Sequence, residues 1–351
     1  MMNYRYRTQL VFCLAFLLIM PLLSGIVQAY RSDANHRTIL VKVIADKKYA
    51  TQSDWREKAR KNLEAASEGL EKVLNIKISI SEYEEWRISN ISDFGELTAA
   101  MVNQVDKGRA DIIIGFTLER GSGRTEELRK DGLTLSRRGF MIKTYSGAPE
   151  QNKMLTYVII HEMIHIFGGV HVFDGSIMSP VFNEETELKL DALNMEIVSI
   201  TKDIDFNRGL ASLSKHQLQR LARLYTRAVR LGNRETPTYY ELGEIYNHLG
   251  QYEDAIDAYR QVVRRDQSIA YAWGEIGDCY RRAGKMDKAI ETFKRAINKV
   301  SQKGIFYGKI AIIYYNQGDF RSSYDNALRA RRNGFEVDQI LWREFKKRGI
   351  S

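Results

Sequence analysis

The sequence predicts an α+β N-terminal domain, with a mixed sheet covered by helices, followed by an all-α solenoid of helical repeats. In residues 30–207, short β-branched or apolar runs alternate with amphipathic stretches of helical period. In residues 236–337, one pattern of small and aromatic residues returns every 34 residues. The charge balance also changes sign. Residues 30–207 contain 24 Lys and Arg against 28 Asp and Glu, or −4, whereas residues 208–351 contain 27 against 16, or +11.

Residues 1–29 have the composition of a secretory signal peptide. Arg5 and Arg7 form a positive start, and residues 10–23 are an almost unbroken apolar run. Small residues before and at Ala29 predict cleavage after that position, and hence an exported protein, periplasmic or secreted. The alternative is an uncleaved membrane anchor, although the apolar run is shorter than the roughly 20 residues that a spanning helix needs.

The N-terminal domain, residues 30–207, is expected to alternate strands with helices. Runs of β-branched or alternating residues predict strands at 38–45, 76–83 and 110–116, with an edge strand at 134–145. Amphipathic periodicity predicts helices at 53–74, 92–106, 153–167 and 184–205. Ser53 is the expected N-cap of the first helix, and Ser92 or Asp93 that of the second. This order of elements implies a mixed sheet.

Residues 236–337 contain three aligned segments, 236–269, 270–303 and 304–337. Their shared columns are an aromatic one (Tyr239, Trp273, Tyr307), a second aromatic one (Tyr246, Tyr280, Tyr314) and a glycine one (Gly250, Gly284, Gly318). These columns resemble the tetratricopeptide repeat, which stacks helix–turn–helix units. In such a repeat small residues allow close helix packing, and the glycine ends the first helix. The resemblance implies a protein partner; a membrane-associated complex is a further candidate.

The flanks of the repeats are also expected to be helical. Residues 208–235 form a linking helix, and residues 338–351 form a capping helix. The third repeat departs most, because Ala327 stands where the other two have an aromatic residue. Cys279 falls on an apolar helix face and is expected to be a buried small hydrophobe. No nucleic-acid motif accompanies the basic charge, so a nucleic-acid partner is not expected.

The chemistry is concentrated in residues 161–171, HEMIHIFGGVH. His161 and His165 are four apart on a predicted helix, so both imidazoles can reach one ion. Glu162 projects beside the metal, where it can take a proton from water. Gly168 can end the helix, because glycine accepts a left-handed backbone, and His171 then becomes a third ligand. The expected cofactor is Zn²⁺.

This motif, followed by Met178 in DGSIMSP, resembles the metzincin clan of zinc peptidases. The resemblance implies that His161, His165 and His171 bind zinc, that Glu162 is the general base and that Met178 forms the Met-turn. It also implies that an extended substrate lies along the edge strand at 134–145. The substrate side chain that follows the cleaved bond would enter a pocket walled by Ser179, Pro180 and Val181. No tyrosine closely follows Met178, and the residue directly after His171 is Val172 rather than an aspartate, so the family within the clan stays open.

The sequence therefore predicts an exported zinc-dependent endopeptidase with a peptide or protein substrate and with repeats that recruit the substrate or a partner. One alternative is a non-catalytic repeat scaffold with a structural or vestigial zinc site. Another is a gluzincin-like site, in which an acidic residue replaces His171 as the third ligand; the candidates are Glu184, Glu185 and Glu187.

Overall fold

The computed structural model describes residues 36–87, 91, 93–119, 132–145, 153–180 and 186–350. The predicted signal peptide lies outside these ranges. The chain divides into two compact units: Met1–Ile166 with Gly175–Ile177 and Val181–Leu190, and Phe167–Asp174 with Met178–Pro180 and Asp191–Ser351. The sequence places the boundary near residue 208, whereas the compact units divide after Ile166. Within the described ranges, no helix combines the length and apolarity needed to cross a membrane.

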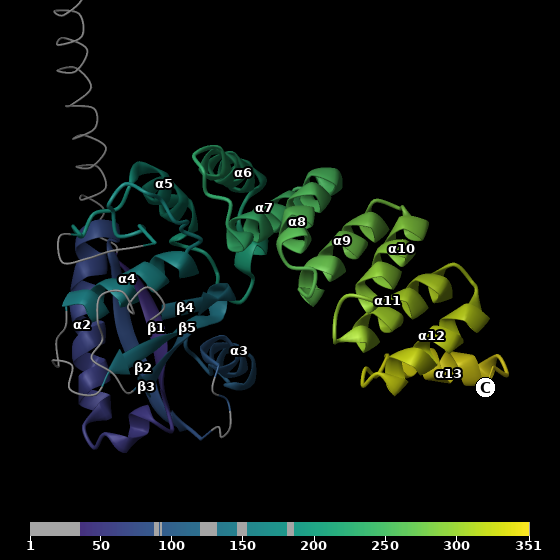
Figure 1. The fold of residues 1–351 in the computed structure, drawn as a ribbon, viewed down its shortest axis with the longest axis horizontal. Helices are drawn as coiled ribbons and strands as arrows, with labels where there is room; N and C mark the ends of the chain where they lie inside the picture. The colour runs from purple at the N-terminus through teal and green to yellow at the C-terminus, as the bar shows by residue number, and fades with distance from the viewer. Residues whose placement is uncertain are drawn as a thin grey trace, which may run out of the picture. The chain divides into compact units, whose positions relative to one another are not determined.

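The first unit is built on a five-stranded sheet (Figure 1). Its strands are β1 (Arg37–Asp46), β2 (Ile76–Trp86), β3 (Ile112–Glu119), β4 (Gly132–Leu135) and β5 (Gly139–Tyr145). Their order is β2-β1-β3-β5-β4. The first three neighbouring pairs in this order are parallel, and β4 pairs antiparallel with β5, so the sheet is mixed, as predicted.

The prediction of one edge strand over 134–145 is wrong. A short 3-10 turn at Ser136–Arg138 reverses the chain and divides the segment into β4 and β5. β5 is internal, between β3 and β4, and its Phe140, Met141 and Ile142 are fully buried. Of these two strands, only β4 lies at an edge of the described sheet, whose other edge is β2, so strand addition on this side involves β4.

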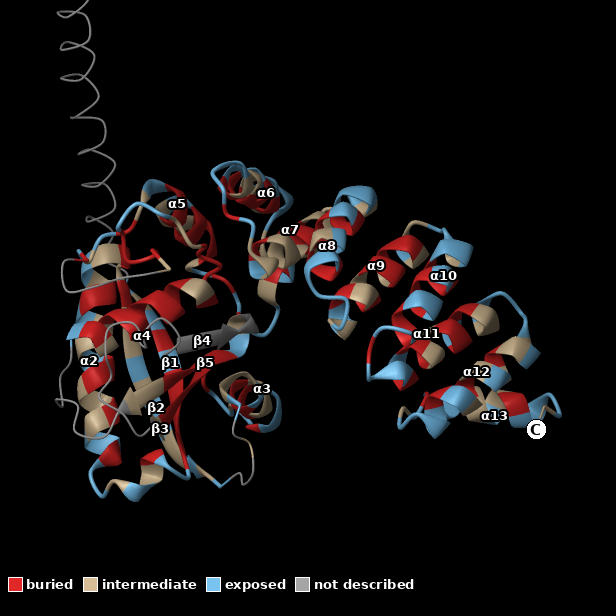
Figure 2. Ribbon diagram, in the orientation of Figure 1, coloured by how far each residue is buried: buried red, intermediate tan, exposed pale blue. Residues whose placement is uncertain are grey.

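Helices α2 (Trp55–Leu74), α3 (Phe94–Gln104) and α4 (Lys153–Ile166) pack around the sheet, whose central strands are buried (Figure 2). α3 buries Leu97 and Met101 against side chains of β1, β3 and β5. α2 and α4 approach closely at Gly69, where a Cβ atom would lie 2.6 Å from Ile160 Cδ1. Asp93, one of the two predicted caps, is the N-cap of α3. α2 begins after Asp54, so the Ser53 cap is wrong by one residue.

The second unit is helical. α5 (Ala192–Thr201) and α6 (Lys215–Arg230) precede three helix pairs and α13 (Gln339–Lys347). The pairs are α7 (Thr236–His248) with α8 (Tyr252–Arg265), α9 (Ala270–Arg282) with α10 (Met286–Ile297), and α11 (Lys303–Asn316) with α12 (Phe320–Arg332). Gly250, Gly284 and Gly318 end the first helix of each pair with φ of 75°, 75° and 82°, as predicted.

α5 is shorter than the helix predicted over 184–205. Asp191 caps it by accepting a hydrogen bond from the Asn194 amide, so the helix begins only at Ala192. Residues 181–185 lie outside the described ranges. Cys279 is fully buried in the apolar core of the helix pairs, as predicted.

Candidate metal centre

α4 brings His161 and His165 to the same face, one turn apart. The helix is apolar on nearly all sides, which buries it, and His161 and Glu162 are each 6% exposed. The two Nε2 atoms lie 3.0 Å apart. A tetrahedral site with zinc–nitrogen bonds of roughly 2.0–2.1 Å separates its nitrogens by about 3.3 Å, so this pair suits a shared cation.

The chain turns sharply after α4. Gly168 has φ of 85°, the left-handed conformation that the sequence analysis expected of it. The Tyr225 hydroxyl of α6 donates to the Gly168 carbonyl oxygen. Asn194 of α5 accepts from the Val170 amide at 2.7 Å and donates to the Val170 carbonyl at 2.8 Å. Helices α5 and α6 therefore fix the backbone that leads to His171.

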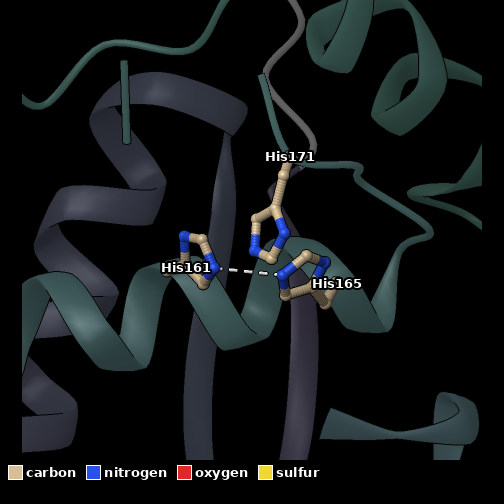
Figure 3. A group of neighbouring side chains, drawn as sticks. All are labelled: His161, His165 and His171. Carbon is tan, nitrogen blue, oxygen red and sulfur yellow. Dashed lines mark hydrogen bonds between the residues drawn. The ribbon is translucent and has the colours of Figure 1, made fainter. Parts of the chain in front are cut away.

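The three histidine rings converge. One nitrogen of each of His161, His165 and His171 lies within 4.8 Å of the others, and Figure 3 shows the rings pointing toward one another. His161 is buried, and the other two are partly exposed. Three imidazoles facing one point form the donor set of a zinc site that keeps a coordination position open.

Two of the rings are oriented by acceptors behind them. His161 Nδ1 lies 2.7 Å from the Ile177 carbonyl oxygen, and His171 Nδ1 lies 2.8 Å from both carboxylate oxygens of Glu235. Because a carbonyl or carboxylate oxygen only accepts, each Nδ1 carries a proton, and in the neutral form of either ring the lone pair is therefore on Nε2. A metal needs that tautomer, so these residues fit zinc by donor type, proximity and orientation.

The structure describes most of the predicted residues around the histidines. Met178 is fully buried, and its carbonyl accepts from the Val172 amide at 3.0 Å, which closes the loop after His171. Ser179 is buried and Pro180 is half-buried, whereas Val181 lies outside the described residues.

The acidic candidates for third ligand are placed differently. Glu184 and Glu185 lie outside the described residues. The Glu187 side chain is 72% exposed, and its carboxylate lies 3.1 Å from Lys189 Nζ. Among the described residues, the group able to hold a metal contains His171 and not Glu187.

Three residues that orient two of the histidines or their backbone have no signal in the sequence: Glu235, Asn194 and Ile177. Glu235 is 64 residues from His171, and an isolated glutamate at the start of a repeat helix has no distinguishing pattern. Ile177 acts through its backbone carbonyl, which no side-chain pattern reveals. Asn194 lies in the first turn of α5, just after the cap residue Asp191, where a polar side chain is common and does not stand out.

Comparison with known proteins identifies the repeats. The family model described as tetratricopeptide repeat matches residues 206–268 and 240–303. This part of the chain therefore consists of tetratricopeptide repeats, which support binding to other proteins. Comparison with curated proteins gave no match. No peptidase family is among these matches.

Solved structures of a protein called MamA resemble part of the chain. MamA from Desulfovibrio magneticus RS-1 is 16% identical, with a TM-score of 0.32, over 40% of this chain and 73% of its own. Another crystal structure of MamA is 20% identical, with a TM-score of 0.29, over 41% of this chain and 95% of its own. Likenesses this weak say nothing about what the present chain does.

Proposed function

We propose that the chain is an exported zinc-dependent peptidase whose helical repeats recruit protein substrates or partners. The observation that carries the proposal is the convergence of His161, His165 and His171, with the buried Glu162 next to the first of them on α4. Three converging imidazoles with an adjacent carboxylate form the constellation of zinc-assisted hydrolysis.

Each residue has a separate task in this proposal. When bound, zinc supplies a Lewis acid that polarises a carbonyl and lowers the pKa of water. His161, His165 and His171 hold the ion through Nε2, while Ile177 and Glu235 keep their rings in place. The Glu162 carboxylate takes the proton of the attacking water and passes it to the leaving amine. β4, at the edge of the sheet, offers its backbone to an extended substrate.

The test uses metal analysis and hydrolysis of a mixed peptide library by the mature chain. Wild type should contain one zinc and hydrolyse peptides, and Glu162→Gln should keep the zinc but lose roughly 10²–10⁴-fold in rate. His171→Ala should lose tight zinc binding, whereas Glu187→Ala should keep it. Retention of zinc in His171→Ala with loss in Glu187→Ala would instead support the gluzincin-like ligand set.

A second candidate is a non-catalytic repeat scaffold in which zinc only stiffens the fold. The comparisons favour it, because they match the repeats and show no peptidase family. This candidate predicts that wild type and Glu162→Gln are equally inactive on every peptide while both bind zinc. Partner capture through the repeats would then be the whole function.

The repeats also suggest the chemistry of their partner. A groove of about 440 Å³ lies over α8, α9 and α10. The aromatic Trp273 and Tyr280 line it together with four cations and one anion: Arg260, Arg264, Lys288, Arg295 and Glu291. A net charge of +3 beside aromatic surface favours an acidic, aromatic-containing segment of a protein. Acidic peptides should bind in fluorescence anisotropy, and Arg264→Glu should weaken binding more than Arg332→Glu on α12.

A further inference from the structure

Glu235 is an unusual helix cap. It occupies the N-cap position of α7, the first repeat helix, yet its side chain makes no capping hydrogen bond to that helix. Capping positions favour Ser, Thr, Asp or Asn, whose short side chains reach the free amides. The Glu235 carboxylate instead lies 2.8 Å from His171 Nδ1 through both of its oxygens. The side chain of Glu235 therefore bonds the histidine, while only its backbone carbonyl serves α7.

The same turn holds His171 at a second point. Asn233, which is 5% exposed, donates from Nδ2 to the His171 carbonyl oxygen at 3.0 Å. Its Oδ1 accepts from the Glu235 amide at 3.2 Å and from the Thr238 hydroxyl at 2.7 Å. Backbone and ring of His171 are thus both bonded to one short turn at the start of the repeats.

An imidazole held at both its backbone and its Nδ1 has little freedom to rotate. A carboxylate behind a ligating histidine fixes the ring and makes Nε2 a better donor. His161 receives its orientation from a neutral carbonyl close in sequence, whereas His171 receives it from a charged group 64 residues away. The third ligand is therefore the one whose geometry depends on the repeats being folded.

We propose that Glu235 is the positioning residue of the third metal ligand, so that the first tetratricopeptide helix sets the affinity of the metal centre. This inference rests on the proposed zinc site. It implies that a partner that shifts the start of α7 changes zinc affinity.

The test measures the zinc affinity of the full mature chain by competition with a chromophoric chelator. Glu235→Ala should raise the Kd for zinc by roughly 10–100-fold, the usual effect of losing such a partner. Glu235→Gln, which keeps an acceptor oxygen without the charge, should restore part of that loss. The visible spectrum of the Co²⁺-substituted protein should change in Glu235→Ala, because the ligand field reports ring geometry.

The matched control is Glu253→Ala. Glu253 lies in the first turn of α8, is exposed and pairs with Lys285, so it tests loss of an acidic residue at the start of the next helix. It should leave the zinc affinity and the Co²⁺ spectrum unchanged. Circular dichroism of the metal-free proteins checks folding. If Glu235→Ala is unfolded, the zinc affinity of Glu235→Gln tests the proposal in its place.

The outcomes separate this inference from the function on which it rests. If wild type binds zinc, His171→Ala does not, and Glu235→Ala binds as tightly as wild type, the positioning role is overturned while the zinc site stands. If wild type itself binds no zinc, the proposed function fails first. A Glu253→Ala defect equal to that of Glu235→Ala would show a general effect of charge and overturn the specific role.

Discussion

A glycine and an aromatic ring face each other in the first two repeats. A Cβ atom at Gly243 would lie 2.6 Å from Tyr259 Cε1, and one at Gly277 would overlap the Phe293 ring. The third repeat has Ala311 and Ala327 in these columns, both fully buried in one cluster. The third repeat therefore lacks the aromatic ring at Ala327 but has a methyl group in place of the facing glycine, at Ala311. The two helices can pack against each other through these smaller side chains.

This pairing predicts the effect of one methyl group. Gly277→Ala should lower the free energy of unfolding by about 1–3 kcal/mol, because the new Cβ overpacks against Phe293. Gly274→Ala on the same helix is the control, since its Cβ would meet only Lys309 Cε at 3.9 Å. It should stabilise by roughly 0.5–1 kcal/mol through helix propensity. Urea unfolding measures both, and equal shifts in the two variants would contradict the pairing.

Cys279 offers a second prediction for a single residue. Burial, with a smaller contribution from the nearby Glu275 carboxylate, raises the pKa of its thiol to about 12. Because the thiolate is the reactive form, the native mature chain should not react with a disulfide reagent at pH 8. The thiol should react fully in guanidinium chloride, where its pKa returns to roughly 8.5. Rapid reaction of the folded protein would show that the helix pairs open readily.

For the candidate site, the sequence predicted the short-range part. The spacing of His161, His165 and His171 is a property of one helix and the turn after it, so the eleven residues 161–171 suffice to specify it. Glu235 could not be predicted, because its role arises only when α7 has folded against the segment containing His171. Long-range hydrogen bonds leave no periodic trace in a single sequence.

The end of α4 determines where the chain places His171, the third ligand of the proposed zinc site. Gly168 has φ of 85°, and a residue with a Cβ atom pays roughly 1–2 kcal/mol in that conformation. Gly168→Ala should therefore destabilise the fold by about that amount and weaken zinc binding, because the chain would leave α4 in another direction. Gly168→Asn is the matched variant, since asparagine tolerates the left-handed region better. Chelator competition measures the affinity; an unaffected Gly168→Ala would mean that Tyr225 and Asn194 alone fix the loop.

Element types were predicted better than their ends and their neighbours. The buried run at 110–116 and the alternating run at 76–83 became β3 and β2, because side-chain periodicity reports burial directly. The segment 134–145 also has strand character, but composition does not reveal the reversal at Ser136–Arg138 that makes β5 internal. Pairing is decided by neighbouring strands, so a single segment cannot specify it.

For the whole molecule, the zinc proposal makes stability depend on metal. A ligand that binds only the folded chain stabilises it by RT ln(1 + [L]/Kd), or about 2.7 kcal/mol at a hundredfold excess over Kd. A strong chelator should therefore lower the thermal midpoint of the wild-type mature chain by a few degrees, and added zinc should restore it.

His171→Ala should melt at the same temperature with and without chelator, because its site is incomplete. Glu162→Gln should keep the full zinc-dependent shift while losing hydrolysis, since in the proposed function this residue takes a proton from water and does not hold the ion. A zinc-dependent shift that survived in His171→Ala would mean that the stabilising metal binds elsewhere in the chain.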